Sequence, residues 1–324
     1  MTVDLDTRLH DPRARQAAAG AVTHPPGLRL HPAGTPGVQT AGTDGQGLQV
    51  DPGLAPLGTA VPEEQWFAGP AAAPATTEGG FHRVPHGDVL FIARAEPDDD
   101  LRTRTRTVYR DLVSACREAG YPYLLRMWNF FGRIHEPEDG LERYQAFCIG
   151  RAEALEALDI PLGSMPAATA IGSDHAGLFV HAIAAREPGA PVENPRQVSA
   201  YHYPERYSPK SPSFARATRI ETPRGPMLLI SGTASITGHE SRHPGDIAGQ
   251  ARETLANLDT LQAEGGADLP GLRWLRVYLR HPEHRDTVEA ILREHYGERT
   301  PPVQWVRGDV CRQELLIEIE GVHA

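Results

Sequence analysis

The stretch that decides the fold is GPMLLISGTASITGHESRHPGDIAGQARETLANLDTLQAEGG, residues 225–266. The apolar run MLLI near its start predicts a buried strand. The next segment, SGTASITG at residues 231–238, is made of small residues that let a backbone pass close to another molecule. A helix is then predicted by apolar residues at helical spacing, namely Ile247, Ala251, Leu255, Leu258 and Leu261. The stretch therefore indicates a strand, a tight loop and an amphipathic helix in succession.

The segments that follow complete one unit. LRWLRVYLR (272–280) alternates and predicts a half-buried strand, and HRDTVEAILREHYG (284–297) predicts a helix. PPVQWVRGDV (301–310) and QELLIEIEG (313–321) predict two closing strands. The order is therefore strand, helix, strand, helix, strand, strand.

The same order occurs once before in the chain. The corresponding segments are GDVLFIARA (87–95), DDDLRTRTRTVYRDLVSACREAG (98–120), YLLRMWNFF (123–131), GLERYQAFCIGRAEALEAL (140–158), PAATAIGS (166–173) and GLFVHAIAA (177–185). We therefore predict an internal duplication of roughly 100 residues, which is too long for a solenoid repeat. The expected class is α+β, with two lobes that each carry helices on one face of a sheet.

The domain boundaries follow from this duplication. Residues 1–80 are rich in Pro, Gly, Ala, Thr and His and show no period, so we expect an irregular or partly disordered segment with a short strand near GLQV. Residues 81–200 form the expected N-terminal lobe, and residues 201–324 the C-terminal lobe.

Composition limits the partners and the compartment. The net charge of -10 argues against nucleic acid and anionic membranes as partners, and no apolar run approaches the roughly 18 residues of a membrane span. The 3 cysteines contain no CxxC pair, which suits a reducing cytoplasm. The chain has a single lysine, Lys210 in the turn-like SPKSP, which argues against Schiff-base chemistry.

Common catalytic motifs are absent from the sequence. HExxH, GxSxG, GxGxxG and the P-loop pattern do not occur. His239, Glu240 and His243, and separately His281 and His284, lack the spacing of a zinc site. We interpret them as surface or hydrogen-bonding residues and expect no metal.

The last predicted strand carries an acid in its middle. Leu315, Ile317 and Ile319 point one way, while Glu314, Glu318 and Glu320 point the other. For Glu314 and Glu320 we accept a solvated strand face. Glu318 would become a protonated general acid if another lobe covered its face, because burial raises the pKa of a carboxyl.

The stretch between the two copies, YHYPERYSPKSPSFARA at residues 201–217, has two interpretations. It is either a proline-rich linker or the wall of a pocket, with tyrosine rings for contact and arginine for anions.

The second copy resembles the RidA/YjgF (chorismate mutase-like) family in SGT, DIAGQARETLANLDTL, LRWLRVYLR and ELLIEIEG. It departs at PPVQWV, where the deaminases of that family carry an arginine after the proline. From about residue 87 onward the chain resembles the chorismatase family more closely. The motifs that carry this resemblance are RMWNFF, GLERYQAFCIGRA, PAATAIGS, YHYPERYSPKSPSFARA and SGTASITGHES. The fold that it implies is two RidA/YjgF-like lobes.

The resemblance implies a cofactor-free enzyme that removes the enolpyruvyl group of chorismate as pyruvate. Glu318 matches the acid that protonates the enol methylene. Arginines suit the two substrate carboxylates. The candidate substrate-binding residues are Arg143, Arg151, Arg216, Tyr201, Tyr203 and Tyr207.

Two residues bear on the product, and they disagree. Ala234 resembles the hydrolytic members, which give a dihydroxycyclohexadiene carboxylate. Cys311 resembles the aromatising members, which give 3-hydroxybenzoate, some with 4-hydroxybenzoate as well. We expect 3-hydroxybenzoate because a thiol contributes chemistry, although Cys311 also fits a small buried apolar residue. A regular strand would place Cys311 and Glu318 on opposite faces, so a bend near GDVCRQ is required.

Two other functions stay open at this point. One is a RidA-like imine deaminase, against which the missing arginine counts, and the other is a non-catalytic binding protein for small aromatic acids. RidA relatives are trimers with sites at subunit seams, so a monomer and a trimer are both open.

Overall fold

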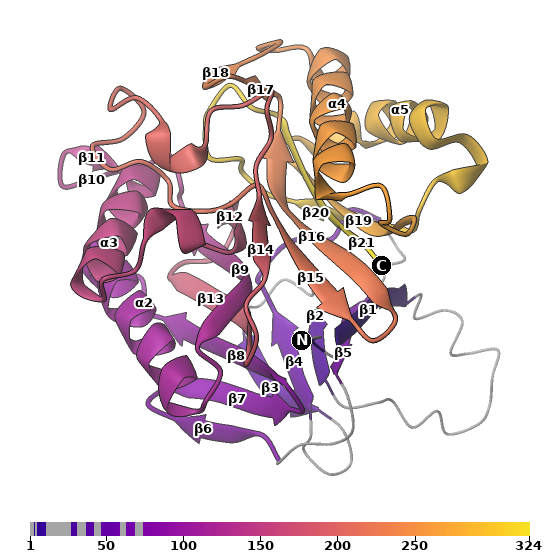
Figure 1. Ribbon diagram of the computed structural model, residues 1–324. Helices are drawn as coiled ribbons and strands as arrows, with labels where there is room; N and C mark the ends of the chain where they lie inside the picture. The colour runs from indigo at the N-terminus through magenta and orange to yellow at the C-terminus, as the bar shows by residue number, and fades with distance from the viewer. Residues whose placement is uncertain are drawn as a thin grey trace.

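Three β-sheets form the framework of the protein (Figure 1). The computed structural model describes residues 3, 5–10, 27–30, 37–41, 47–58, 63–68 and 74–324. Two sheets of six strands belong to the two lobes, and a sheet of five strands is built from the N-terminal segment. No helix of the described residues is long and apolar enough to cross a membrane.

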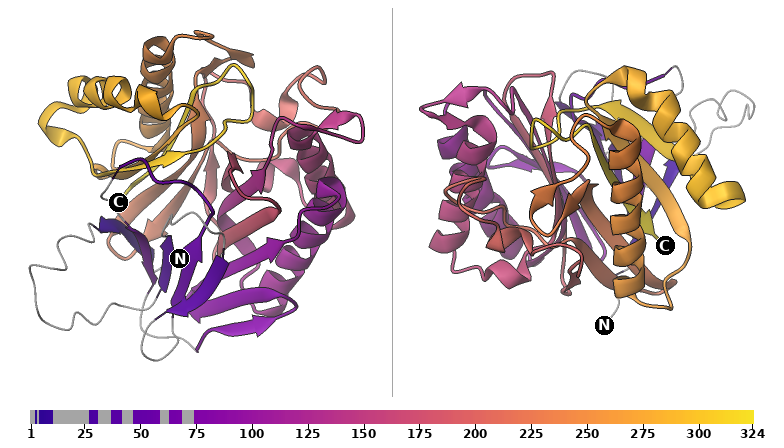
Figure 2. Two further views of the ribbon diagram at one scale, coloured as in Figure 1. Left: turned by 180° about the vertical axis from the view of Figure 1, so that it is seen from behind. Right: turned by 90° about the horizontal axis from the view of Figure 1, so that it is seen from above.

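The first lobe is a mixed sheet with strand order β12-β9-β13-β8-β7-β6. Its strands are β6 (Thr76–Glu78), β7 (Phe81–His86), β8 (Val89–Glu96), β9 (Tyr123–Gly132), β12 (Ala167–Ser173) and β13 (Leu178–Ala185). Helices α2 (Leu101–Glu118) and α3 (Arg143–Ala157) pack together on its outer face (Figure 2). The Asp100 side chain caps α2 by accepting from the Thr103 amide, and Gly120 follows the helix with a positive φ of 81°.

The second lobe repeats this arrangement, with order β20-β19-β21-β16-β15-β14. Its strands are β14 (Ala190–Val192), β15 (Ala217–Thr222), β16 (Gly225–Ala234), β19 (Leu272–Leu279), β20 (Val303–Arg307) and β21 (Ile317–His323). Its helices are α4 (Ile247–Gly265) and α5 (Arg285–Tyr296). In each lobe one pair, β12 with β9 and β20 with β19, is parallel. The predicted α+β duplication is confirmed, and β14 joins the second sheet ahead of the expected boundary at residue 200.

Short elements complete the described chain. They are the two-stranded pairs β10 (Pro137–Glu138) with β11 (Leu141–Glu142) and β17 (Ile236–Thr237) with β18 (Glu240–Ser241), and the 3-10 turns η1 (Leu162–Ser164), η2 (Ala200–His202), η3 (Pro282–His284) and η4 (Gly297–Arg299).

Described residues of the segment 1–80, predicted to be irregular or partly disordered with one short strand, form a sheet of five strands. Its order is β1-β5-β2-β4-β3, with β1 (Leu5–His10), β2 (Gly27–Leu30), β3 (Gly37–Ala41), β4 (Gly47–Asp51) and β5 (Glu63–Ala68). The strand expected at GLQV is β4. These strands are only 4 to 6 residues long, and they gain stability by packing against the two lobes.

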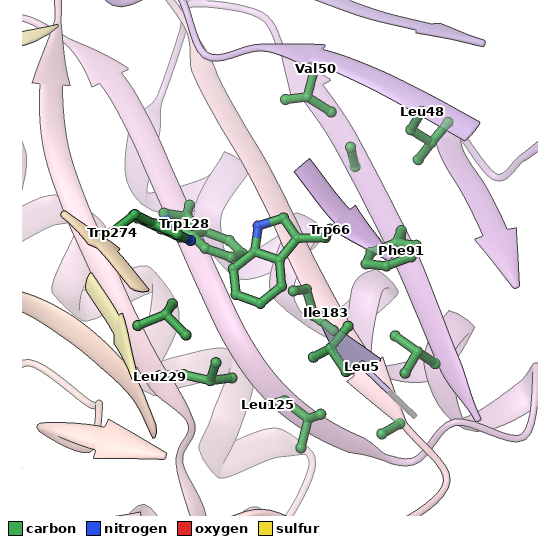
Figure 3. Packing of buried hydrophobic residues seen from close by; sticks show 14 of the residues in the cluster. Leu5, Leu48, Val50, Trp66, Phe91, Leu125, Trp128, Ile183, Leu229 and Trp274 are labelled. Carbon is green, nitrogen blue, oxygen red and sulfur yellow. The ribbon is translucent and has the colours of Figure 1, made fainter. Parts of the chain in front are cut away.

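The three sheets meet at a shared core formed by their helix-free faces. Trp66 of β5, Trp128 of β9 and Trp274 of β19 lie together there (Figure 3). The ring centroid of Trp66 is 5.9 Å from that of Trp128 and 6.1 Å from that of Trp274, both in edge-on geometry. Strand β19 is therefore buried on both faces, and the prediction that it is half-buried is wrong.

The two lobes also join along their edges. Ala167 at the start of β12 bridges Ala215, and Gly172 near its end bridges Asp309. Strand β12 of the first lobe thus runs beside β16 of the second. This seam positions the site described next.

Candidate active site

Glu318 lies on β21 at the seam between the lobes. Its cross-strand neighbours are Ala234 on β16 and Tyr278 on β19. The carboxyl group lies against the backbone of Gly232, close to the hydroxyl of Thr169 on β12. Only 5% of the residue is exposed, so the first lobe covers the strand face that carries the acid.

The surroundings keep this carboxyl protonated at neutral pH. Burial, and after it the negative charge of Glu320, raise the pKa of Glu318 from 4.5 to about 8. The guanidinium groups of Arg126 and Arg216 act in the opposite direction. A neutral carboxyl at pH 7 can serve as a general acid.

Glu320 is buried, which corrects the prediction of a solvated strand face. It is 1% exposed, and its carboxylate pairs with Arg126 and Arg276, each at 2.7 Å. Although burial raises the pKa of Glu320, the two guanidinium groups bring it below the usual value. Glu314, by contrast, is exposed as expected, and it accepts a hydrogen bond from Ser241.

A cavity of about 310 Å³ opens beside Glu318. Both lobes contribute to its wall: the first through α3 and β12, and the second through β16, residues 203–216 and the turn before β21. Of the residues predicted for the site, the cavity is lined by Glu318, Cys311, Ala234, Arg151, Arg216, Tyr203 and Tyr207. The segment 201–217 is therefore the wall of a pocket.

Arg151 is a buried guanidinium with free donors. It is 2% exposed, and its Nε and Nη2 atoms have no hydrogen-bond partner among the described residues. The group lies over the Phe147 ring at 4.9 Å. Buried donors without partners are costly, and an anion in the cavity would satisfy them.

Arg216 approaches the cavity from the second lobe. Its Nη2 atom donates to the Tyr203 hydroxyl and to the Val198 carbonyl oxygen, each at 2.8 Å. Its Nε atom is buried and has no partner among the described residues. Because both partners of Arg216 are neutral, its charge is not compensated by them.

Two predicted residues lie elsewhere. Arg143 does not line the cavity, because its guanidinium donates to the Gly132 carbonyl oxygen and pairs with Asp98 and Glu138. Tyr201 also lies outside the lining and packs edge-on against His202. The prediction that Arg143 and Tyr201 line the site together with the other candidates is therefore not supported by the structure.

The segment SGTASITG, residues 231–238, lies at the cavity as predicted, but residues 231–234 belong to β16 and residues 236–237 to β17, so the prediction of a tight loop directly after Ile230 is wrong. Gly232, Ala234 and Ile236 line the cavity, so the small residues of SGTASI face the site. Cys311 lines the same cavity because residues 311–314 form a bend and turn before β21 begins at Ile317. The predicted bend is confirmed. Burial raises the pKa of the Cys311 thiol to about 12, with Glu318 adding to the effect, so the thiol is neutral at pH 7.

This arrangement is matched in known proteins. A 3-hydroxybenzoate synthase from Streptomyces hygroscopicus is 41% identical over 252 residues, which cover 73% of this chain and 74% of that protein. The chain belongs to the chorismatase family. A chorismatase from Streptomyces rapamycinicus is 38% identical over 286 residues, which cover 82% of this chain and 85% of the relative.

Two further comparisons agree with the chorismatase family. Residues 64–184 match the family described as Chorismatase FkbO/Hyg5-like, N-terminal. A crystal structure of a chorismatase superposes with a TM-score of 0.84 at 30% identity and covers 100% of this chain and 99% of that one. The predicted family and fold class are confirmed.

Sequence reasoning missed several residues that line this cavity. Thr169, Tyr144 and Gln145 line the cavity from the first lobe. Arg312 and Arg206 also line the cavity: Arg312 lies 3.9 Å from the centroid of the Tyr207 ring, and Arg206 donates to the Tyr207 hydroxyl at 3.0 Å. Arg206 and Arg312 adjoin residues already selected, so proximity in sequence was the available signal.

The histidine clusters form no metal site among the described residues. His239 Nδ1 lies 3.2 Å from the Tyr207 hydroxyl, and His243 lies 4.0 Å from Glu253. The rings of His281 and His284 contact each other edge-on. The hydrogen-bonding interpretation of His239 is confirmed.

Proposed function

We propose that this protein cleaves the enolpyruvyl ether of chorismate to pyruvate and 3-hydroxybenzoate, without a cofactor. The observation that carries the proposal is a protonated, buried Glu318 in a cavity that also holds unpartnered guanidinium donors. Chorismate is a dianion with an electron-rich enol ether, so it needs an acid for the double bond and cations for its carboxylates.

The first step is protonation of the terminal methylene by Glu318. A new C–H bond forms, and the positive charge that results is shared between the neighbouring carbon and the ether oxygen. Water or the ring hydroxyl then adds its oxygen to this carbon and gives up a proton. The bond between this carbon and the ether oxygen breaks, so pyruvate keeps the added oxygen and the ring keeps the ether oxygen. For 3-hydroxybenzoate, the bond from the ring to its second oxygen also breaks and one ring hydrogen is lost as a proton. The overall conversion of chorismate to pyruvate and 3-hydroxybenzoate consumes no net water.

We assign one guanidinium group of the cavity to each of the two carboxylates of chorismate. Arg216 acts electrostatically on Glu318, so we assign to it the enolpyruvyl carboxylate, whose methylene must reach the acid. Arg151, on α3 of the other lobe, is assigned the ring carboxylate. Tyr203 and Tyr207 flank the ring, and each is in turn packed against Arg312.

The product assignment rests on Cys311 and on the 41% identity to a relative that is named a 3-hydroxybenzoate synthase. The neutral thiol of Cys311 lines the cavity and is available as a weak hydrogen-bond donor to an oxygen of the intermediate. Ala234, which narrows the space beside Glu318, supports the hydrolytic product as the second candidate.

The test is incubation with chorismate and no added cofactor. Pyruvate is assayed with lactate dehydrogenase, and the ring product is identified by chromatography. Glu318→Gln should lower pyruvate release by about 10²- to 10⁴-fold and leave chorismate binding measurable by calorimetry. The control is Glu294→Gln, which changes an exposed carboxyl on α5. Normal turnover by Glu318→Gln would refute the acid assignment, and a wild-type protein that binds chorismate without releasing pyruvate would be a binding protein.

A further inference from the structure

A second carboxylate lies on the same strand face as the acid. Glu320 follows Glu318 by two residues on β21, so both side chains point toward the first lobe. The Glu320 carboxylate accepts from Trp128 Nε1 at 3.0 Å and from the Thr169 hydroxyl, in addition to its ion pairs with Arg126 and Arg276. These contacts fix its position beside the cavity.

The ion pairs continue as a chain across all three sheets. Arg276 of β19 also pairs with Glu64 of β5, which in turn accepts from Trp66 Nε1. Arg126, Glu320, Arg276 and Glu64 are each 2% exposed or less. In this chain of ion pairs, two positive and two negative groups alternate in the order Arg126, Glu320, Arg276 and Glu64.

This balance has a consequence for Glu318. The four charges neutralise one another without it, so ionised Glu318 would add a fifth charge next to Glu320 in a buried site. The groups that face Glu318 from the surrounding elements are Glu320, Arg126, Arg216, Cys311, Tyr144 and Tyr278, the cross-strand neighbour of Glu318. Of these, Arg126 is already paired with Glu320, and Arg216 carries the charge that we assign to a substrate carboxylate.

We propose that Glu320 is the positioning residue of the general acid: held ionised by Arg126 and Arg276, it keeps the proton on Glu318 until substrate takes it. The inference rests on the proposed role of Glu318. Desolvation is the larger effect on Glu318, and Glu320 is the largest electrostatic one. Removal of one charge from the chain should therefore move the ionisation of Glu318 in a direction set by the sign of that charge.

Two substitutions of opposite sign test this. Glu320→Gln removes the negative neighbour and should move the alkaline limb of kcat/KM toward acid by about 1 to 3 pH units. Arg126→Met removes a positive neighbour and should move the limb toward alkali. Glu320→Asp keeps the charge, so its limb should stay near that of the wild type even if the rate falls. A purely structural role for Glu320 would lower the rate by the same factor at every pH.

Difference infrared spectroscopy gives a readout that does not depend on activity. The carboxylic acid band that disappears in Glu318→Gln is followed against pH in the wild type and in each variant. The proposal predicts that the wild-type band persists above pH 7. The corresponding band should disappear at lower pH than in the wild type in Glu320→Gln, and at higher pH in Arg126→Met. Shifts of both variants in one direction, or a band that does not move, would overturn it. If Glu320→Gln does not fold, the Arg126→Met shift and the wild-type titration still decide. Full activity of Glu318→Gln would refute the proposed role of Glu318 in catalysis. The infrared titration would still test whether Glu320 controls the ionisation of Glu318.

Discussion

The carboxyl group of Glu318 occupies the space that a side chain at Gly232 would need. A Cβ atom built on Gly232 would overlap the Glu318 Oε1 atom and would lie 3.2 Å from the Thr169 hydroxyl. The φ angle of Gly232 is not among the positive values of the chain, so the glycine is required for room and not for its backbone conformation. The lack of a side chain at Gly232 therefore leaves the space that the Glu318 carboxyl group occupies.

Gly232→Ala should displace the Glu318 carboxyl from the cavity. We expect a fall in kcat on the order of 10²-fold, because a displacement near 1 Å at a catalytic group has this effect. Steady-state pyruvate release is the measurement. Gly271→Ala is the matched control, since a Cβ there meets nothing within 4 Å. Equal activities of the two variants would contradict the close contact.

The pH profile should report the ionisation of Glu318. A general acid must be protonated, so kcat/KM for chorismate should fall as the pH rises through about 8, the raised pKa of Glu318. Bound substrate brings carboxylates that oppose ionisation, so the limb of kcat should lie at higher pH than that of kcat/KM. A profile that is flat from pH 6 to 9, with chemistry shown to be rate-limiting, would contradict the assignment.

Glu318→Gln should stabilise the fold at neutral pH. In the native state the pKa of Glu318 is raised from 4.5 to about 8, so folding takes up a proton between these values and stability falls as the pH rises through this window. At pH 7 the cost is roughly 3 kcal/mol, which a neutral glutamine would not incur. Urea unfolding at pH 4 and pH 7 measures the effect. The difference in free energy of unfolding between the variant and the wild type should be smaller at pH 4 than at pH 7. Equal free energies of unfolding at pH 7 would argue against a raised pKa of Glu318.

Two arginines of α3 should behave differently. Arg151→Met should raise KM for chorismate by about 10- to 100-fold, since it removes charge-assisted hydrogen bonds to a substrate carboxylate. Arg143→Met should leave KM near the wild-type value but lower Tm, because it breaks the ion pairs with Asp98 and Glu138. Steady-state kinetics and calorimetry separate the two. The reverse pattern would restore Arg143 as the binding residue.

Cys311→Ala should change the product more than the rate. We expect the ratio of 3-hydroxybenzoate to the dihydroxycyclohexadiene carboxylate to fall, and pyruvate release to stay within about tenfold of the wild type, because protonation by Glu318 precedes product choice. Chromatography of the ring products gives the ratio. Cys116→Ala is the control, since Cys116 lies outside this cavity. An unchanged ratio would show that Cys311 only fills space.

The shared order of strand, helix, strand, helix, strand, strand in each lobe could be read from the sequence, because periodicity is a local property, but strands β7, β14 and β15 were not predicted. The N-terminal sheet could not, because its strands are only 4 to 6 residues long and pair with strands distant in the sequence, as β1 does with β5. The burial of Arg276 and Glu320 could not be predicted from the sequence either. Polar residues on one strand face predict solvent, unless a second sheet covers that face and supplies counter-charges.

Sequence also could not say why one copy carries the acid. When LRMWNFF of the first lobe is aligned with LRVYLRH of the second, Trp128 is equivalent to Tyr278. The cross-strand partner of Trp128 is His181, and that of Tyr278 is Glu318. His181 is fully buried and stacks on Trp128 with ring centroids 4.6 Å apart. The position in the first lobe is thus filled by core packing, whereas the position in the second lobe faces the seam.

The sequence by itself determined the two α+β lobes, the chorismatase family and Glu318 as the candidate acid, since these depend on residue type and spacing along the chain. Only the tertiary structure decided that Arg151 and Arg216 face the cavity while Arg143 and Tyr201 do not. It also decided that Glu320 belongs to a buried chain of charges. The physical reason is that burial and electrostatic pairing depend on which surfaces meet, and these surfaces come from segments far apart in the sequence.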